Sequence, residues 1–166
     1  MNKLIVLSGV PGSGKSYFSK AVKKMRNSHV YVVSSDELRK EITGSQSNLT
    51  AEELVWKLFY SLADSYSLDK DGIVIMDATH TSSHLRVDKN IQFKDKFDEI
   101  DLVMWNIDRD IVMNQNFQRD YPIPIEAMEK FFEIFELPTQ KDYDFFDKVL
   151  VVTNGDLAHV LKELNI

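Results

Sequence analysis

Eight consecutive residues near the start of the chain have the types and the spacing that bind phosphate groups. Residues 9–16, with the sequence GVPGSGKS, fit the pattern Gly-x-x-x-x-Gly-Lys-[Ser/Thr] without a mismatch. In such a loop the backbone N–H groups converge on phosphate oxygens, and the N-terminus of the following helix adds its positive dipole end. Lys15 would then reach the β- and γ-phosphates of a nucleoside triphosphate, and the Ser16 hydroxyl would bind Mg²⁺.

The sequence on either side of this loop supports the interpretation. An apolar run at residues 4–7 is typical of a buried strand, and residues 16–26 have apolar side chains at helical spacing. A strand, a glycine-rich loop and a helix in this order predict a nucleotide site with ATP and Mg²⁺ as cofactors. The residues that we expect to contact the nucleotide are Gly9, Pro11, Gly12, Ser13, Gly14, Lys15, Ser16 and Tyr17.

A first candidate for the base lies after the next apolar run. Ser34 and Glu37 form a capping box, so Asp36 should lie in the first turn of a helix with Arg39 three residues further along. A carboxylate beside a helix N-terminus stays ionised at neutral pH, and it could accept the proton of an attacking hydroxyl. The alternative role for Asp36 is that of a helix-capping acid.

A second acid, Asp77, ends the apolar run at residues 73–76. It could hold Mg²⁺ through water, orient Asp36, or orient an acceptor hydroxyl, and the sequence leaves these roles open. Thr79 and His80 follow it and could contact the substrate, although a single histidine in a loop is often a bystander. Because ligand sites in open parallel sheets form beyond the C-terminal ends of the strands, we expect these residues to meet at one edge.

The elements that must position these residues alternate between strands and helices. A helix with a capping box of Thr50 and Glu53 is predicted over residues 50–66, and a last helix begins near Leu157. Alternation of this kind predicts an α/β fold with helices on both faces of a parallel five-stranded sheet. The predicted strands lie at residues 4–7, 30–33, 73–76, 102–105 and 149–152.

One segment, residues 109–136, interrupts the alternation with two helical patterns at 109–119 and 124–136. It is either a helical lid or a crossover that only packs. Arg109 and Arg119 stand at the two ends of its first helix. An arginine that folds over a transferring phosphoryl group would neutralise its developing charge, and Arg119, at the turn, is better placed to do so.

Composition limits the class of protein. A chain of 166 residues is predicted to form one domain, and the lack of cysteine suits a reducing cytoplasm and rules out thiolate zinc sites. We expect a cytoplasmic protein, because the first apolar run leads straight into the loop and nothing approaches a membrane span. A net charge of −6 argues against a protein that coats nucleic acid, but not against a local basic pocket.

The order of these motifs resembles the kinase domain of phage 5′-polynucleotide kinase. The resemblance rests on the loop at 9–16, on Ser-x-Asp-x-x-Arg at 34–39, on Asp-x-Thr at 77–79, and on Arg119 ahead of a Pro-Ile pair. It implies that Lys15 and Ser16 bind the ATP phosphates and Mg²⁺, that Asp36 is the base on a 5′-hydroxyl, and that Arg119 is the lid arginine. The resemblance of the motifs to a kinase family also narrows the expected α/β fold to a three-layer phosphate-loop kinase fold.

The resemblance also implies an acceptor side. Arg39 would hold the 3′-phosphate of the acceptor, Asp77 would steady the same end of the site, and Arg86 falls where relatives often carry an acceptor-side arginine. Two features depart from the family: its second lid arginine is replaced by Gln115, and no phosphatase domain follows.

These observations favour an ATP-dependent kinase that phosphorylates the 5′-hydroxyl end of DNA or RNA. The alternative is a small-molecule kinase for a nucleoside, a sugar or an antibiotic, which the acidic charge favours. A GTP-hydrolysing switch is disfavoured, because the chain has no Asn-Lys-x-Asp motif. The oligomeric state cannot be predicted from this sequence.

Overall fold

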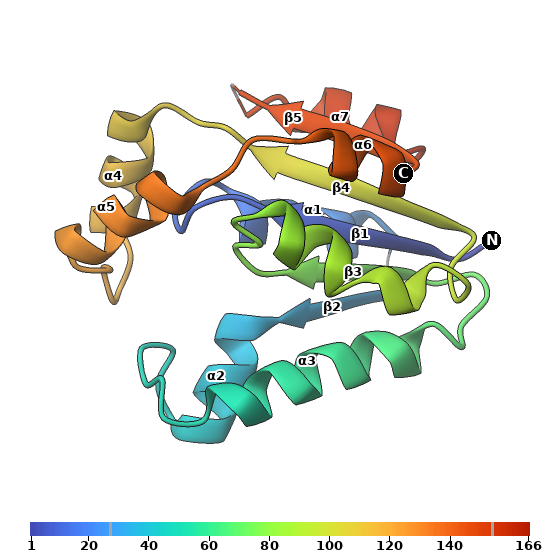
Figure 1. The fold of residues 1–166 in the computed structure, drawn as a ribbon, viewed down its shortest axis with the longest axis horizontal. Coiled ribbons are helices and arrows are strands. Elements are labelled where there is room, and N and C mark those ends of the chain that lie inside the picture. The colour runs from blue at the N-terminus through green and yellow to red at the C-terminus, as the bar shows by residue number, and fades with distance from the viewer. Residues whose placement is uncertain (27, 154) are drawn as a thin grey trace.

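A five-stranded parallel sheet forms the centre of the computed structural model, which describes residues 1–26, 28–153 and 155–166 (Figure 1). The strand order is β2-β3-β1-β4-β5, and every neighbouring pair is parallel. Each strand contains one of the predicted apolar runs, because such runs can be buried from both faces of a sheet. The strands are β1 (Lys3–Ser8), β2 (Val30–Ser34), β3 (Ile73–Asp77), β4 (Glu99–Trp105) and β5 (Lys148–Val152).

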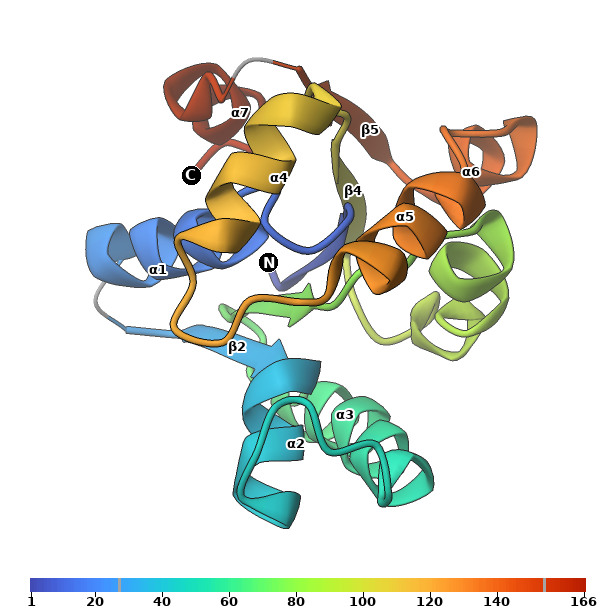
Figure 2. The same cartoon turned by 90° about the vertical axis from the view of Figure 1, so that its left-hand side faces the viewer.

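Helices cover both faces of the sheet, as predicted (Figure 2). One face packs on α1 and α7 through a core that includes Phe18, Val22 and Leu161, and the other packs on α3, α6 and the short helices η1 and η2. The helices are α1 (Lys15–Arg26), α2 (Ser35–Thr43), α3 (Glu52–Tyr66), η1 (His84–Asp88), η2 (Ile91–Phe93), α4 (Arg109–Phe117), α5 (Ile125–Ile134), α6 (Gln140–Phe145) and α7 (Leu157–Glu163).

Helix α3 differs from its prediction in two ways. It begins at Glu52, and the expected capping box is absent because the Thr50 hydroxyl donates to the Asn48 side chain instead, at 2.7 Å. The apolar residues that recur at helical spacing over residues 54–66 are also not all buried. Leu54 and Leu58 are exposed, since only one narrow face of the helix packs against the sheet.

The C-terminal ends of all five strands lie at the same edge of the sheet, because the strands are parallel. The α4–α5 pair and the start of α2 lie beyond this edge (Figures 1 and 2). The fold therefore places the phosphate loop, the end of β3 and the helix pair around one region. Within the described ranges, no helix is both long enough and apolar enough to cross a lipid bilayer.

Candidate active site

The phosphate loop connects β1 to α1 and has a backbone that only glycine adopts easily. Gly12 and Gly14 have φ angles of +82° and +114°. A side chain at Gly12 would also meet the carbonyl oxygen of Val112 in α4 at 3.2 Å. The Ser13 hydroxyl is buried without a hydrogen-bond partner in the described structure, which is the state expected of a donor that a bound phosphate would satisfy.

Lys15 is buried inside this loop. Its Nζ donates to the carbonyl oxygens of Gly9 at 2.7 Å and Val10 at 3.0 Å. Burial lowers the pKa of Lys15 to about 8, although the nearby carboxylates of Asp77 and Asp36 act in the opposite direction. The protein alone therefore compensates this positive charge incompletely, and a polyphosphate would complete the compensation.

Asp77, at the end of β3, lies against the first turn of α1. Its Oδ2 accepts from the hydroxyls of Ser16 at 3.1 Å and Ser19 at 3.4 Å. Burial raises the pKa of Asp77, and the charge of Lys15 and the Ser16 hydrogen bond lower it in part. A carboxylate and a hydroxyl at this spacing offer the hard oxygen ligands that Mg²⁺ prefers, so the donor set fits the metal.

Asp36 lies in the first turn of α2, where the Ser34 hydroxyl caps the helix by accepting from the Glu37 N–H at 3.3 Å. Arg39 donates to Asp36 Oδ1 at 2.8 Å, and Arg119 lies 3.8 Å from Oδ2 on its other side. The Asp36 side chain remains 50% exposed between these two arginines. It can therefore be reached by a substrate.

The α4–α5 pair packs closely on the loop. Asn116 is fully buried, donates to the Ile123 carbonyl oxygen at 2.8 Å and accepts from the Ile123 N–H at 3.0 Å, so it fixes the turn that carries Arg119. Arg109 has a different role from Arg119. It pairs with Glu129 of α5 and lies over the ring of Phe132, so it ties the two helices together.

A pocket of about 330 Å³ lies beside the loop, between α1, α4 and α7. Gly14 and Tyr17 line it from the loop and α1, Trp105 lines it from the end of β4, and Gln115 lines it from α4. Gln115 stands where the resembled family has its second lid arginine, so this wall carries a neutral amide instead of a positive charge. Tyr17 is 72% exposed here and is available to a ligand.

Two further residues predicted to contact the substrate, Thr79 and His80, are bound to the phosphate loop and to β1. The Thr79 carbonyl oxygen accepts from the Gly9 N–H at 2.9 Å, so this residue joins the end of β3 to the phosphate loop. His80 is buried with a φ of +39°, and its Nδ1 donates to the Leu7 carbonyl oxygen at 2.5 Å. Burial lowers the pKa of His80 to about 4, so its ring is neutral at pH 7.

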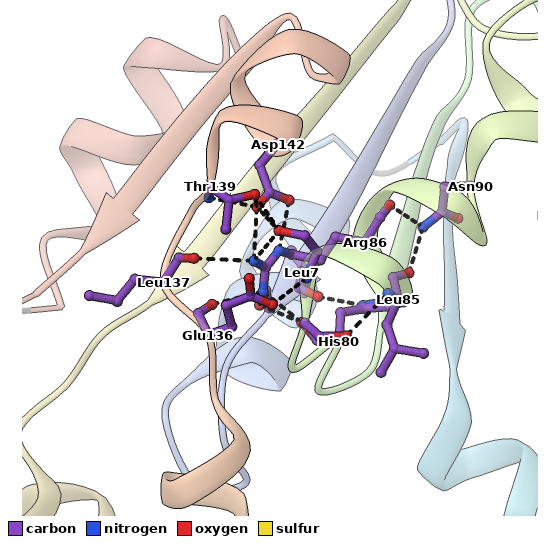
Figure 3. Close-up of polar contacts among 12 residues, drawn as sticks. Leu7, His80, Leu85, Arg86, Asn90, Glu136, Leu137, Thr139 and Asp142 are labelled. Carbon is purple, nitrogen blue, oxygen red and sulfur yellow. Dashed lines mark hydrogen bonds and ion pairs between the residues drawn. The ribbon is translucent and has the colours of Figure 1, made fainter.

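Arg86 does not join this group of residues. Its side chain is completely buried and binds Asp142 with two hydrogen bonds of 2.9 Å, from Nε and Nη2 (Figure 3). Its Nη1 donates to the carbonyl oxygens of Glu136 at 2.9 Å and His80 at 3.2 Å. We therefore exclude Arg86 from the acceptor side of the site, since its guanidinium is occupied within the protein interior.

Sequence reasoning missed two residues of this region. Trp105 belongs to the buried core beside α1, and it also lines the pocket at a strand end, which is the position that marks a site residue in such sheets. Glu52 was missed because its partner, Arg39, lies 13 residues away on a different helix. It binds Arg39 through both carboxylate oxygens, at 2.5 and 3.1 Å.

Comparison with known proteins agrees with this architecture. A family model described as an AAA domain (AAA_33) matches residues 4–138. The chain is similar to a gluconokinase from Sinorhizobium meliloti 1021, with a TM-score of 0.65 and 17% identity, over 97% of this chain and 88% of that one. It is also similar to Chaetomium thermophilum Kti12 in complex with ADP-AlF3, with a TM-score of 0.72 and 14% identity, over 97% of this chain and 96% of that one. A fungal RNA kinase matches with a TM-score of 0.65 and 15% identity, over 98% of this chain and 84% of that one.

At these identities the similarity to solved structures shows the fold alone. The prediction of a phosphate-loop kinase fold, with a parallel five-stranded sheet and helices on both faces, is confirmed.

Proposed function

We propose that this chain, which belongs to the AAA domain family, transfers the γ-phosphate of ATP to a hydroxyl group, most favourably the 5′-hydroxyl of a DNA or RNA end. The single observation that carries the proposal is the position of Asp36. Its carboxylate lies 3.8 Å from Arg119 and acts electrostatically on Lys15 of the phosphate loop. An exposed acid, a lid arginine and the loop lysine are the groups that a phosphoryl transfer requires.

In the proposed reaction the carboxylate of Asp36 accepts the proton of the acceptor hydroxyl. The hydroxyl oxygen then forms a bond to the γ-phosphorus as the bond to the β-phosphate oxygen breaks, and ADP leaves. Lys15 neutralises the β- and γ-phosphates, and Arg119 neutralises the charge on the transferring group. The ring of Tyr17 and the peptide groups of the loop would hold the rest of the nucleotide.

Mg²⁺ would be held at Ser16 and Asp77 and would neutralise charge on the phosphates. Among residues 1–26, 28–153 and 155–166, no group of three or more His, Asp or Glu side chains could hold a metal alone. Phosphate oxygens and water would therefore complete its coordination, which is usual for Mg²⁺. Ser16 and Ser19 keep the Asp77 carboxylate turned toward α1.

Two observations support a nucleic-acid acceptor. The motif spacing resembles the polynucleotide kinases, and a solved RNA kinase has the same fold. Arg39, which donates to Asp36, would lie on the acceptor side of the site.

A second candidate function, a kinase of a small hydroxylated molecule, is favoured by one specific contact. The Arg39 guanidinium, which would hold the acceptor phosphate, already binds the Glu52 carboxylate. The net charge of −6 and the similarity to a gluconokinase point in the same direction.

Transfer of labelled γ-phosphate tests the proposal. The protein, ATP and Mg²⁺ are incubated with 5′-hydroxyl oligonucleotides of DNA and RNA, and in parallel with a pool of nucleosides, sugars and antibiotics. We expect label on the oligonucleotides, and a loss of about a thousandfold in Asp36→Asn because the general base is removed. Nucleotide affinity should stay close to that of the unaltered protein.

The matched control is Glu37→Gln, which neutralises an exposed acid in the same helix turn. This variant should retain its activity. Label found only in the small-molecule pool would establish the second candidate. Loss of ATP binding in Asp36→Asn would contradict the role of Asp36 as the base.

A further inference from the structure

Arg39 stands next to the candidate base, but most of its hydrogen-bonding capacity is already used. Its Nε and Nη2 donate to the two carboxylate oxygens of Glu52, and its Nη1 donates to Asp36 at 2.8 Å and to the Gln46 carbonyl oxygen at 3.4 Å. The side chain is 9% exposed, so water does not replace these partners easily. The paired N–H donors of this guanidinium are therefore already bound to a carboxylate of the protein itself.

Glu52 is held in that position by its own surroundings. It comes from the first turn of α3, and its Oε2 also accepts from Trp56 Nε1 at 3.0 Å. The hydrogen bond from Arg39 holds the pKa of Glu52 below its ordinary value, so the group is a carboxylate at neutral pH. Its side chain is 31% exposed, which leaves it a route into solvent.

A guanidinium fork binds one oxoanion in the paired geometry, and a carboxylate and a phosphate both fit it. The Glu52 carboxylate therefore occupies the place that a phosphate of a substrate would take beside Asp36. We propose that Glu52 is a specificity-determining residue that competes with an acceptor phosphate for Arg39. This inference rests on the proposed function, because it takes the region around Asp36 as the acceptor side.

The competition has a defined consequence for acceptor choice. A phosphate that docks on Arg39 must displace Glu52 into solvent and separate it from Trp56, whereas an acceptor without a phosphate leaves this network intact. The unaltered protein should therefore distinguish weakly between acceptors with and without a phosphate near the reacting hydroxyl. Weakening the contact between Glu52 and Arg39 should create that distinction.

The test compares thymidine 3′-phosphate with thymidine, measured by titration calorimetry with the protein saturated by a non-hydrolysable ATP analogue and Mg²⁺. In Glu52→Gln we expect affinity for thymidine 3′-phosphate to rise about tenfold, because an amide competes poorly with a phosphate for a guanidinium. Affinity for thymidine should stay constant. The matched control is Glu53→Gln, which removes the same charge from an exposed neighbour on α3 and should give no gain.

Two further variants keep the test decisive. Adding Arg39→Gln to Glu52→Gln should abolish the gain, since the gain acts through Arg39. Trp56→Phe, which removes the donor to Glu52 Oε2 and keeps an aromatic ring against Phe59, should give a smaller gain in the same direction, and it serves if Glu52→Gln is poorly folded.

Equal gains in Glu52→Gln and Glu53→Gln would overturn the inference in favour of general electrostatics, and so would no gain in any variant. A gain in Glu52→Gln without phosphate transfer to any nucleic-acid acceptor would support the role of Glu52 while contradicting the proposed polynucleotide function. Phosphate transfer to oligonucleotides without a gain in affinity in Glu52→Gln would support the polynucleotide function and contradict the role of Glu52.

Discussion

Two of the regions in which this protein buries charged groups do so in opposite ways. In the interior, Arg86 and Asp142 are both inaccessible to solvent and satisfy each other with paired hydrogen bonds. At the strand edge, Lys15 and Asp77 are also buried, but they lack an equivalent set of partners. The same kinds of side chain therefore experience different surroundings within one small domain.

The pKa shifts express this difference. Burial raises the pKa of Asp142, yet hydrogen bonds from Arg86 and Ser83 outweigh it and hold the value below the ordinary one. For Asp77 burial prevails, and its pKa is raised, while burial lowers that of Lys15 to about 8. Removing one partner of a completely paired buried charge destabilises the fold, whereas a buried charge with incomplete partners is poised for a ligand.

The largest expected effect lies in the interior. Arg86→Ala removes one member of the pair and leaves the Asp142 carboxylate buried without a counter-charge, which should cost about 3–5 kcal/mol of unfolding free energy. Urea denaturation followed by circular dichroism measures this loss. Replacing both residues with apolar ones of similar size should recover most of it, and a stable Arg86→Ala protein would contradict the structural role.

The second largest effect is expected at the strand edge, on the turnover number of the proposed phosphate transfer. Arg119→Ala should lower the turnover number about a hundredfold, because a group that stabilises transition-state charge is lost. The melting temperature should hardly change, since the ion pair of the Arg119 guanidinium with Asp36 is long, at 3.8 Å. Arg109→Ala is the matched control, because it loosens the α4–α5 pair and leaves Asp36 untouched. A large fall in melting temperature in Arg119→Ala would mean that this helix pair serves as core.

The smallest effect is a pH dependence of nucleotide binding. Lys15 has a pKa of about 8 in the protein alone, and bound phosphate should raise it, so binding takes up a proton above that pH. Affinity for ADP should therefore be constant below pH 8 and fall by up to about tenfold per pH unit above it. Calorimetry in buffers of different ionisation enthalpy measures the proton that is taken up when ADP binds. A flat profile up to pH 10 would show that Lys15 remains fully charged without ligand.

Local sequence signals predicted the fold and the loop. The five apolar runs became the five strands, and Gly12 and Gly14 of the loop have the positive φ angles that glycine permits. Ser34 caps α2 as expected and so places Asp36 in the first turn. Each of these features depends on neighbouring residues alone, which is why sequence reasoning could find it.

The sequence failed where partners are distant along the chain. The family resemblance implied an acceptor-side role for both Arg39 and Arg86. Yet Arg39 lies beside Asp36, while Arg86 meets an aspartate 56 positions away. The pairing of Glu52 with Arg39 was hidden for the same reason, because it depends on how α2 and α3 pack.

The sequence by itself therefore determined the α/β alternation, the phosphate loop and the acid that follows β2, since each is encoded in short-range periodicity and spacing. Only the tertiary structure decided which charges are enclosed and which remain open at the strand edge. That outcome depends on desolvation and on partners brought together by packing. Arg86 became part of the interior, and Lys15, Asp77 and Asp36 gathered at one edge, because the parallel sheet and its covering helices set the distances between them.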